Sequence, residues 1–97
     1  MATRKQYLNR LRRWTQKNPG THQRTLMYKR CGKKCFLGTR KSFPICNHNC
    51  SYNLGGIQSA YIRAREMQKL VKKGAIKKHT HKYYGTIANR AKRMLYK

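Results

Sequence analysis

The four cysteines are the residues whose type and spacing could carry chemistry. They form two pairs, Cys31-x3-Cys35 and Cys46-x3-Cys50, with ten residues between the pairs. Four thiolates at such spacings can bind one Zn²⁺ tetrahedrally, and His48 could replace one sulfur. The same residues could instead form disulfides, most simply Cys31–Cys50 and Cys35–Cys46. The residues alone leave both alternatives open, and zinc is the one cofactor that they suggest.

Catalysis is disfavoured by a shortage of acidic side chains, since Glu66 is the only one. Glycoside hydrolysis needs two placed carboxyl groups, and Mg²⁺-dependent phosphoryl transfer needs acidic metal ligands. A Cys–His nucleophile is conceivable, because His48 lies between Cys46 and Cys50. Cysteines in two matched pairs are far more typical of a structural role. We therefore predict that the protein is not an enzyme and has no small-molecule substrate.

The charge of the chain indicates an anionic partner. Twenty-five Lys and Arg residues face a single acidic residue, which gives a formal net charge of +24. Self-repulsion of this size opposes compaction unless a nucleic acid, an anionic membrane face or acidic protein surfaces neutralise it. Binding through phosphate contacts would be salt-sensitive and largely independent of sequence. The candidate anion- or nucleic-acid-binding residues are Arg4, Lys5, Arg10, Arg12, Arg13, Lys33, Lys34, Arg40, Lys41, Arg63, Arg65, Lys69, Lys72, Lys73, Lys77, Lys78, Arg90 and Arg93.

Aromatic side chains are interleaved with these cations, as stacking platforms for single-stranded nucleic acids are. Those on helical stripes are expected to be core or interface residues instead: Tyr7, Trp14, Tyr61 and Tyr84. Tyr52 and Tyr83 are the freer candidates for stacking, whereas Tyr28 and Tyr96 are interleaved without further distinction. No helix-turn-helix, ribonucleoprotein or two-Cys-two-His finger pattern is present, so nothing predicts base-specific reading.

Apolar periodicity predicts three helices. Residues 3–17 carry an apolar stripe from Tyr7 to Thr15 and end at Asn18-Pro19-Gly20. Residues 57–73 carry the strongest stripe and end at Gly74, and a third stripe runs from residue 84 to about residue 96. Residues 21–30 are expected to be a short strand or an extended lead-in. Asn53-Leu54-Gly55-Gly56 is expected to be a break in the chain.

These elements predict a small, mainly α protein in which a central four-cysteine knot of loops or short strands is flanked by basic amphipathic helices. The knot is expected to have a small core of its own, supplied by Phe36-Leu37 and Phe43-Pro44-Ile45. The predicted organisation is a basic N-terminal helical arm over residues 1–20, a cysteine module over 21–55 and two basic helices over 56–97.

Targeting signals are not evident from the sequence. No apolar run approaches the ~18–20 residues that a membrane span needs, and no apolar region typical of a secretory signal follows Met1. We therefore expect a reducing compartment, which by itself favours zinc over disulfides.

The central stretch CGKKCFLGTRKSFPIC, followed by a fourth cysteine and the helix IQSAYIRARE, resembles a group of short basic proteins of nucleocytoplasmic large DNA viruses. These are chlorella-virus-like and related giant viruses. The pattern is carried by Cys31, Gly32, Lys34, Cys35, Phe36, Leu37, Phe43, Pro44, Ile45, Cys46, Cys50, Ala60, Arg63 and Ala64. The match covers roughly residues 30–95. It departs from the pattern at Gly38-Thr39, where a proline often follows Cys-Phe-Leu, and residues 1–29 have no counterpart.

The resemblance implies a structural component of the virion, present in the host cytoplasm or virus factory during assembly. Such viruses often encode a thiol oxidase, which would permit disulfides there. We expect a minor capsid or cement protein on the inner side of the shell. Its partners would be capsid proteins, with viral DNA or an anionic inner membrane as further partners. The alternative is a sequence-nonspecific DNA-binding protein that packages the genome.

Overall fold

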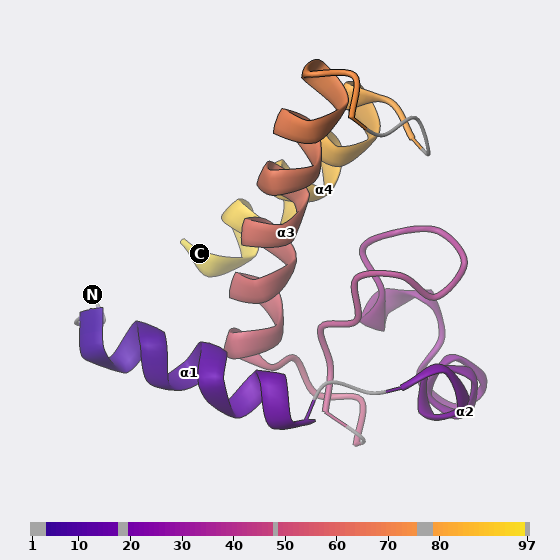
Figure 1. The fold of residues 1–97 in the computed structure, drawn as a ribbon. Helices are drawn as coiled ribbons and strands as arrows, with labels where there is room; N and C mark the ends of the chain where they lie inside the picture. The colour runs from indigo at the N-terminus through magenta and orange to yellow at the C-terminus, as the bar shows by residue number, and fades with distance from the viewer. Residues whose placement is uncertain (1–3, 18–19, 48, 76–78, 97) are drawn as a thin grey trace.

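The structure is a computed structural model, and it describes residues 4–17, 20–47, 49–75 and 79–96. Within these ranges the chain forms α1 (Arg4–Lys17), α2 (Thr21–Cys31), the short 3₁₀ helix η1 (Lys33–Cys35), α3 (Leu54–Lys72) and α4 (His81–Leu95). α3 stands at the centre, α4 packs along it and α1 lies across its N-terminal end (Figure 1). The cysteine segment connects α2 to α3. The predicted fold class, a mainly α protein around a central cysteine knot, is therefore confirmed.

The contact between α3 and α4 forms the main core. Small alanines on both helices are buried there, among them Ala64 and Ala91, and the isoleucines Ile57 and Ile87 fill the remaining space. Alanine lets two helix backbones approach closely, so the stripes predicted from the sequence become one packed seam. Gln68 lies in the same seam and donates a hydrogen bond from Nε2 to the His81 carbonyl oxygen at 3.4 Å.

Side-chain caps set where α3 and α4 begin. Asn53 Oδ1 accepts a hydrogen bond from the Gly56 amide at 3.0 Å, and Thr80 Oγ1 accepts one from the Tyr83 amide at 3.1 Å. Such caps satisfy amides that have no partner within the helix. As a result the helices begin at Leu54 and His81, three residues before the starts predicted at 57 and 84. The predicted break at residues 53–56 was wrong.

Two glycines at the start of α3 let α1 dock there. A Cβ on Gly56 would lie 3.0–3.1 Å from the Trp14 ring, and a Cβ on Gly55 would lie 2.5 Å from the Arg10 carbonyl oxygen. Real Cβ atoms do not approach an oxygen to 2.5 Å, so only glycine fits at position 55. Trp14 itself is 4% exposed, and its burial anchors the cationic α1 to the rest of the molecule.

Residues 21–31 form the helix α2, so the predicted strand or extended lead-in was wrong. The helix buries only Met27, and its apolar residues form no continuous stripe. Its ends hold it instead: the Gly20 amide donates to Gln23 Oε1 at 3.3 Å, and Gly32 ends it with a φ of 78°. Glycine adopts such a left-handed conformation without a steric penalty.

The cysteine knot is built around an irregular hairpin between Cys35 and Cys46. An isolated bridge pairs Phe36 with Pro44, and the Leu37 amide donates to the Phe43 carbonyl oxygen at 3.1 Å. Of the residues predicted to form the core of the knot, Phe36, Leu37, Pro44 and Ile45 are buried, whereas Phe43 is only partly buried against it. The described residues contain two isolated β-bridges, and none of them forms a β-strand of greater length.

Candidate anion-binding surface

The cysteines form two disulfides, Cys31–Cys50 and Cys35–Cys46, which is the nested pairing named above as the simplest. Their Cα atoms are 5.3 and 5.2 Å apart. Sulfurs joined in disulfides are not the thiolates that a zinc site needs. Within the described ranges no three His, Cys, Asp or Glu side chains are grouped to hold a metal ion, and His48 lies outside those ranges.

A tight turn at the tip of the hairpin presents two cations. The Ser42 amide donates to the Thr39 carbonyl oxygen at 3.1 Å, and both central residues have positive φ, 54° at Arg40 and 61° at Lys41. This combination is the pattern of a type I′ turn. Phe43 follows with a φ of 56°, so three of four consecutive residues adopt left-handed backbone.

Hydrogen bonds from two helices hold this turn in place. Tyr83 Oη of α4 accepts from the Thr39 amide at 2.9 Å and contacts Thr39 Oγ1 at 3.1 Å. On the other side, Lys41 Nζ donates to Thr25 Oγ1 of α2 at 3.1 Å, and Arg24 Nη1 donates to the Lys41 carbonyl oxygen at 3.5 Å. The turn is thus tied to α2 and to α4, which lie far apart in the sequence.

A groove of about 690 Å³ lies between the hairpin, η1 and α4. Four of the predicted anion-binding residues line it, namely Lys33, Arg40, Lys41 and Arg90, and the rings of Tyr28, Phe36 and Tyr83 complete it. No acidic side chain lines the groove, because Glu66 is the only one in the chain and lies on α3. The structure therefore brings together cations from three separate elements.

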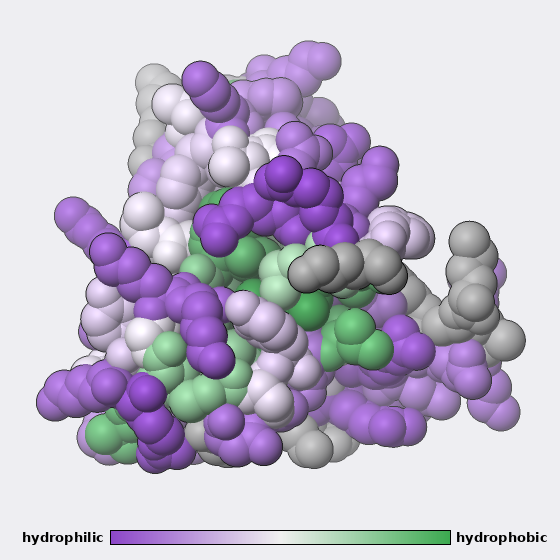
Figure 2. Space-filling view, turned by 180° about the vertical axis from the view of Figure 1, so that it is seen from behind, coloured by the Kyte–Doolittle hydropathy of each residue, from purple (hydrophilic) through white to green (hydrophobic). Residues whose placement is uncertain are grey.

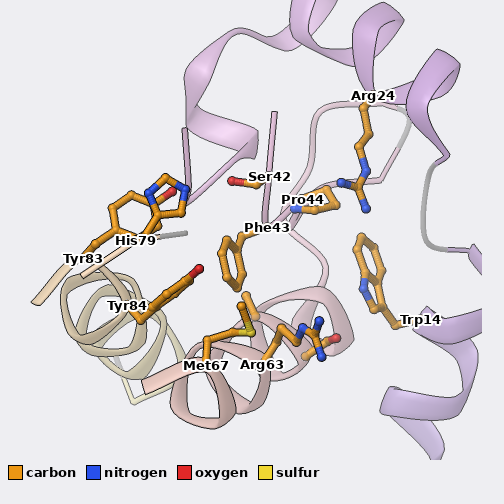
Figure 3. A pocket seen from close by; sticks show the side chains of 12 residues that line it. Trp14, Arg24, Ser42, Phe43, Pro44, Arg63, Met67, His79, Tyr83 and Tyr84 are labelled. Carbon is orange, nitrogen blue, oxygen red and sulfur yellow. The ribbon is translucent and has the colours of Figure 1, made fainter. Parts of the chain in front are cut away.

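A second cavity of about 360 Å³ opens where α1, α2, the hairpin, α3 and α4 meet. In Figure 3 the Arg24 and Arg63 side chains enter it from α2 and α3, with the Trp14 ring between them. The rings of Phe43 and Tyr84 also line it and meet edge to face, with centroids 6.4 Å apart. Burial raises the pKa of the Tyr84 phenol, Tyr83 adds to the rise, and Arg63 partly offsets it.

The other predicted cations that the structure describes do not line the groove. Arg63 lies 3.7 Å from Glu66, and Arg10 is half-buried on α1. The following are exposed: Arg4, Lys5, Arg12, Arg13, Lys34, Arg65, Lys69, Lys72, Lys73 and Arg93. Lys77 and Lys78 lie outside the described residues. Hydrophilic side chains project around the face in Figure 2, with apolar surface gathered towards its middle.

The aromatic candidates for stacking are placed differently from the prediction. The Tyr83 ring stacks on His79 with centroids 4.0 Å apart, and its hydroxyl accepts a hydrogen bond from the Thr39 amide. Tyr83 therefore has a structural role and is not a free platform for a base. Tyr52 is 52% exposed but does not line the groove, whereas Tyr28 is 39% exposed and does. Trp14 and Tyr84 are buried, as predicted. Nothing in the sequence singled out Tyr28, because it lies in the segment read as extended.

Replacing Tyr83 by phenylalanine should release the hairpin tip from α4 while keeping the ring. We expect a loss of about 0.5–1.5 kcal/mol in the free energy of unfolding, the net value of an ordinary hydrogen bond. Amide exchange at Thr39 should accelerate strongly, since its N–H loses its acceptor. Hydrogen exchange measured residue by residue checks this, with Tyr52→Phe as the control at an exposed position. Unchanged exchange at Thr39 in the Tyr83 variant would contradict the proposed anchoring.

Comparison of the chain with family models, with curated proteins and with solved structures found no match. None of the helices in the described residues is long and apolar enough to cross a membrane.

Proposed function

We propose that this protein is a non-enzymatic structural component of a large DNA virus particle that acts through its charge. Its place would be the inner side of the shell, as a minor capsid or cement protein whose cations neutralise an anionic surface. The resemblance of the cysteine segment to short basic virion proteins supports the setting, and the charge distribution supports the mode of action.

The main support for this proposal is that the cationic side chains are accessible at the surface and that a single acidic side chain is available to neutralise them. Among the side chains that the structure describes, no Lys or Arg is buried, and α1, α2, α3 and α4 all carry exposed cations. One carboxylate side chain can neutralise one of 25 cationic side chains, so the rest of the charge must be met from outside. Acidic capsid surfaces, lipid phosphates and nucleic acid are all partners that can neutralise this positive charge.

Docking onto other proteins is favoured by apolar side chains left on the surface. Tyr96 is 73% exposed, Tyr52 52%, Leu54 49% and Leu8 47%. A protein that only coats a polyanion needs no such groups, whereas a shell component can bury them against its neighbours. This supports a position against the shell.

The test is to open purified particles and separate the shell from the genome at high salt. A shell component held partly by apolar contacts stays with the shell after salt has stripped the DNA, because salt weakens charge contacts and leaves apolar contacts intact. Recovery of the protein with the genome, or in solution as the DNA decondenses, would sink the shell assignment.

A second candidate is sequence-nonspecific DNA binding during genome packaging, which the cation-lined groove favours. Under this alternative, naked duplex DNA should bind tightly and dissociate steeply with salt. The log–log slope should be about −0.9 for each phosphate contact on duplex DNA. The particle fractionation described above separates the two candidates directly.

A further inference from the structure

The two central residues of the turn at the hairpin tip are of types that rarely adopt its left-handed backbone conformation. A type I′ turn needs positive φ at both central positions, which is why Asn-Gly is strongly preferred there. Here the two positions are Arg40 and Lys41, with φ of 54° and 61°. Side chains with a Cβ are strained in this region, and strain of this kind is concentrated at functional sites.

The strained residues are held by a rigid frame. The Cys35–Cys46 disulfide closes the base of the hairpin, and Tyr83 and Thr25 grip its tip through the hydrogen bonds described above. A Cβ on Gly38 would lie 2.7 Å from the Phe43 ring, so the hairpin is also tightly packed. The frame fixes the backbone beneath the two cations before any ligand arrives.

Both cations line the groove, where Lys33 of η1 and Arg90 of α4 join them. Tyr28, 39% exposed, lies along the same groove with its ring 6.1 Å from that of Phe36. A cationic groove bordered by an accessible aromatic ring is the arrangement that binds unpaired nucleic acid. The phosphates contact the cations and a base stacks on the ring.

We propose that this groove is a binding site for a single-stranded stretch of nucleic acid. Lys33, Arg40, Lys41 and Arg90 contact its phosphates, and Tyr28 stacks on one base. A duplex satisfies the cations but not the ring, because its bases are stacked on one another. The proposal goes beyond the structural role above and holds whether the protein sits in the shell or on the genome.

The decisive variant is R40N/K41G, which installs the residues that the turn prefers. It relieves backbone strain but also removes the Lys41–Thr25 hydrogen bond, two effects of about 1 kcal/mol each and of opposite sign. The melting temperature should therefore stay within about 4–8 °C of that of the unaltered protein, so the variant remains folded for the binding assay. Affinity for a fluorescent oligothymidine, measured by anisotropy at about 0.15 M salt, should fall at least ~10-fold. The log–log salt slope should shrink by about 1.4, or ~0.7 for each lost phosphate contact on a single strand.

The matched control is K72Q/K73Q, which removes the same charge from exposed positions at the end of α3, outside the groove. It should weaken binding far less. Equal losses in the two variants would mean that binding depends on net charge alone, and this would overturn the proposal. Unchanged affinity in R40N/K41G would overturn it too. Arg40→Asn alone keeps the hydrogen bond between Lys41 and Thr25. Comparing its melting temperature with that of R40N/K41G therefore shows how much this hydrogen bond contributes to stability.

Tyr28→Leu tests the identity of the ligand. It leaves the charge intact and removes the ring, so oligothymidine should bind about 5- to 100-fold more weakly, whereas a duplex of equal length should be unaffected. Equal behaviour of the two oligonucleotides would overturn the single-strand assignment. Preferred binding to anionic phospholipid vesicles would overturn the choice of nucleic acid. None of these outcomes depends on where the protein fractionates in the particle, so the two proposals can fail separately.

Discussion

Replacing both Cys35 and Cys46 by alanine is expected to lower the free energy of unfolding by about 2–5 kcal/mol, as the loss of a native disulfide from a small domain does. Both cysteines are nearly inaccessible, at 0% and 2% exposed, and they close the base of the hairpin. For 97 residues this corresponds to a fall in melting temperature of at least about 8 °C. Thermal unfolding followed by circular dichroism measures it.

The outer pair provides the comparison. Cys31 and Cys50 close a longer loop, with a sequence separation of 19 against 11, but both are only half-buried. Loop entropy alone would make the outer disulfide slightly the more stabilising of the two. Burial reverses this order, because removing the inner sulfurs also leaves a cavity in the core. A larger loss for the Cys31→Ala/Cys50→Ala variant would show that packing around the inner pair contributes little.

Gly55→Ala is expected to detach α1 from the body of the protein. Alanine normally stabilises a helix relative to glycine by about 0.5–1 kcal/mol. Here the added Cβ would meet the Arg10 carbonyl oxygen at 2.5 Å, so α1 must move away. Trp14 is the only tryptophan in the chain and is 4% exposed, so its fluorescence reports directly on docking. We expect its emission to shift towards that of solvent-exposed indole and its quenching by acrylamide to increase.

A matched control is Gly20→Ala, since nothing lies within 4 Å of a Cβ at that position. Its tryptophan emission should match that of the unaltered protein. The melting temperature of α3 and α4 should change little in the Gly55 variant, because their seam does not include α1. Blue-shifted, protected emission from Gly55→Ala would mean that α1 adjusts around the methyl group, and the close approach would then not require glycine.

Sequence periodicity predicted α1, α3 and α4 and missed α2. The predicted stripe is buried in α3 and α4, whereas α1 buries Trp14 and leaves Leu8 47% exposed. The stripes of α1, α3 and α4 follow from apolar residues repeating every three or four positions. α2 has one buried residue, Met27, and is held by its ends and by the hairpin, so no periodic signal existed. The caps Asn53 and Thr80 lie outside the apolar stripes, so periodicity placed the starts of α3 and α4 three residues too late.

The candidate site was predictable in composition and not in geometry. Spacing suggested that the four cysteines act together, but oxidation rather than metal binding became clear only from the structure. The cations were identified by type alone, so nothing distinguished Arg40 or Arg90 from residues on the outer helix faces. Their meeting in one groove depends on contacts between residues far apart in the chain, such as Thr39 with Tyr83. Such contacts leave no local pattern.

The nested arrangement of the disulfides has a consequence for the integrity of the chain. A single backbone cut anywhere between Cys35 and Cys46 leaves two fragments that both cross-links still join. A cut between Cys31 and Cys35, or between Cys46 and Cys50, leaves them joined by the outer cross-link alone. The exposed tip at Arg40 is a cleavage site for a trypsin-like protease, which cuts after Arg and Lys. It lies between Cys35 and Cys46, so both disulfides would still join the two fragments after cleavage there. A nicked copy would remain one covalent unit in oxidising surroundings and would separate into two pieces only on reduction.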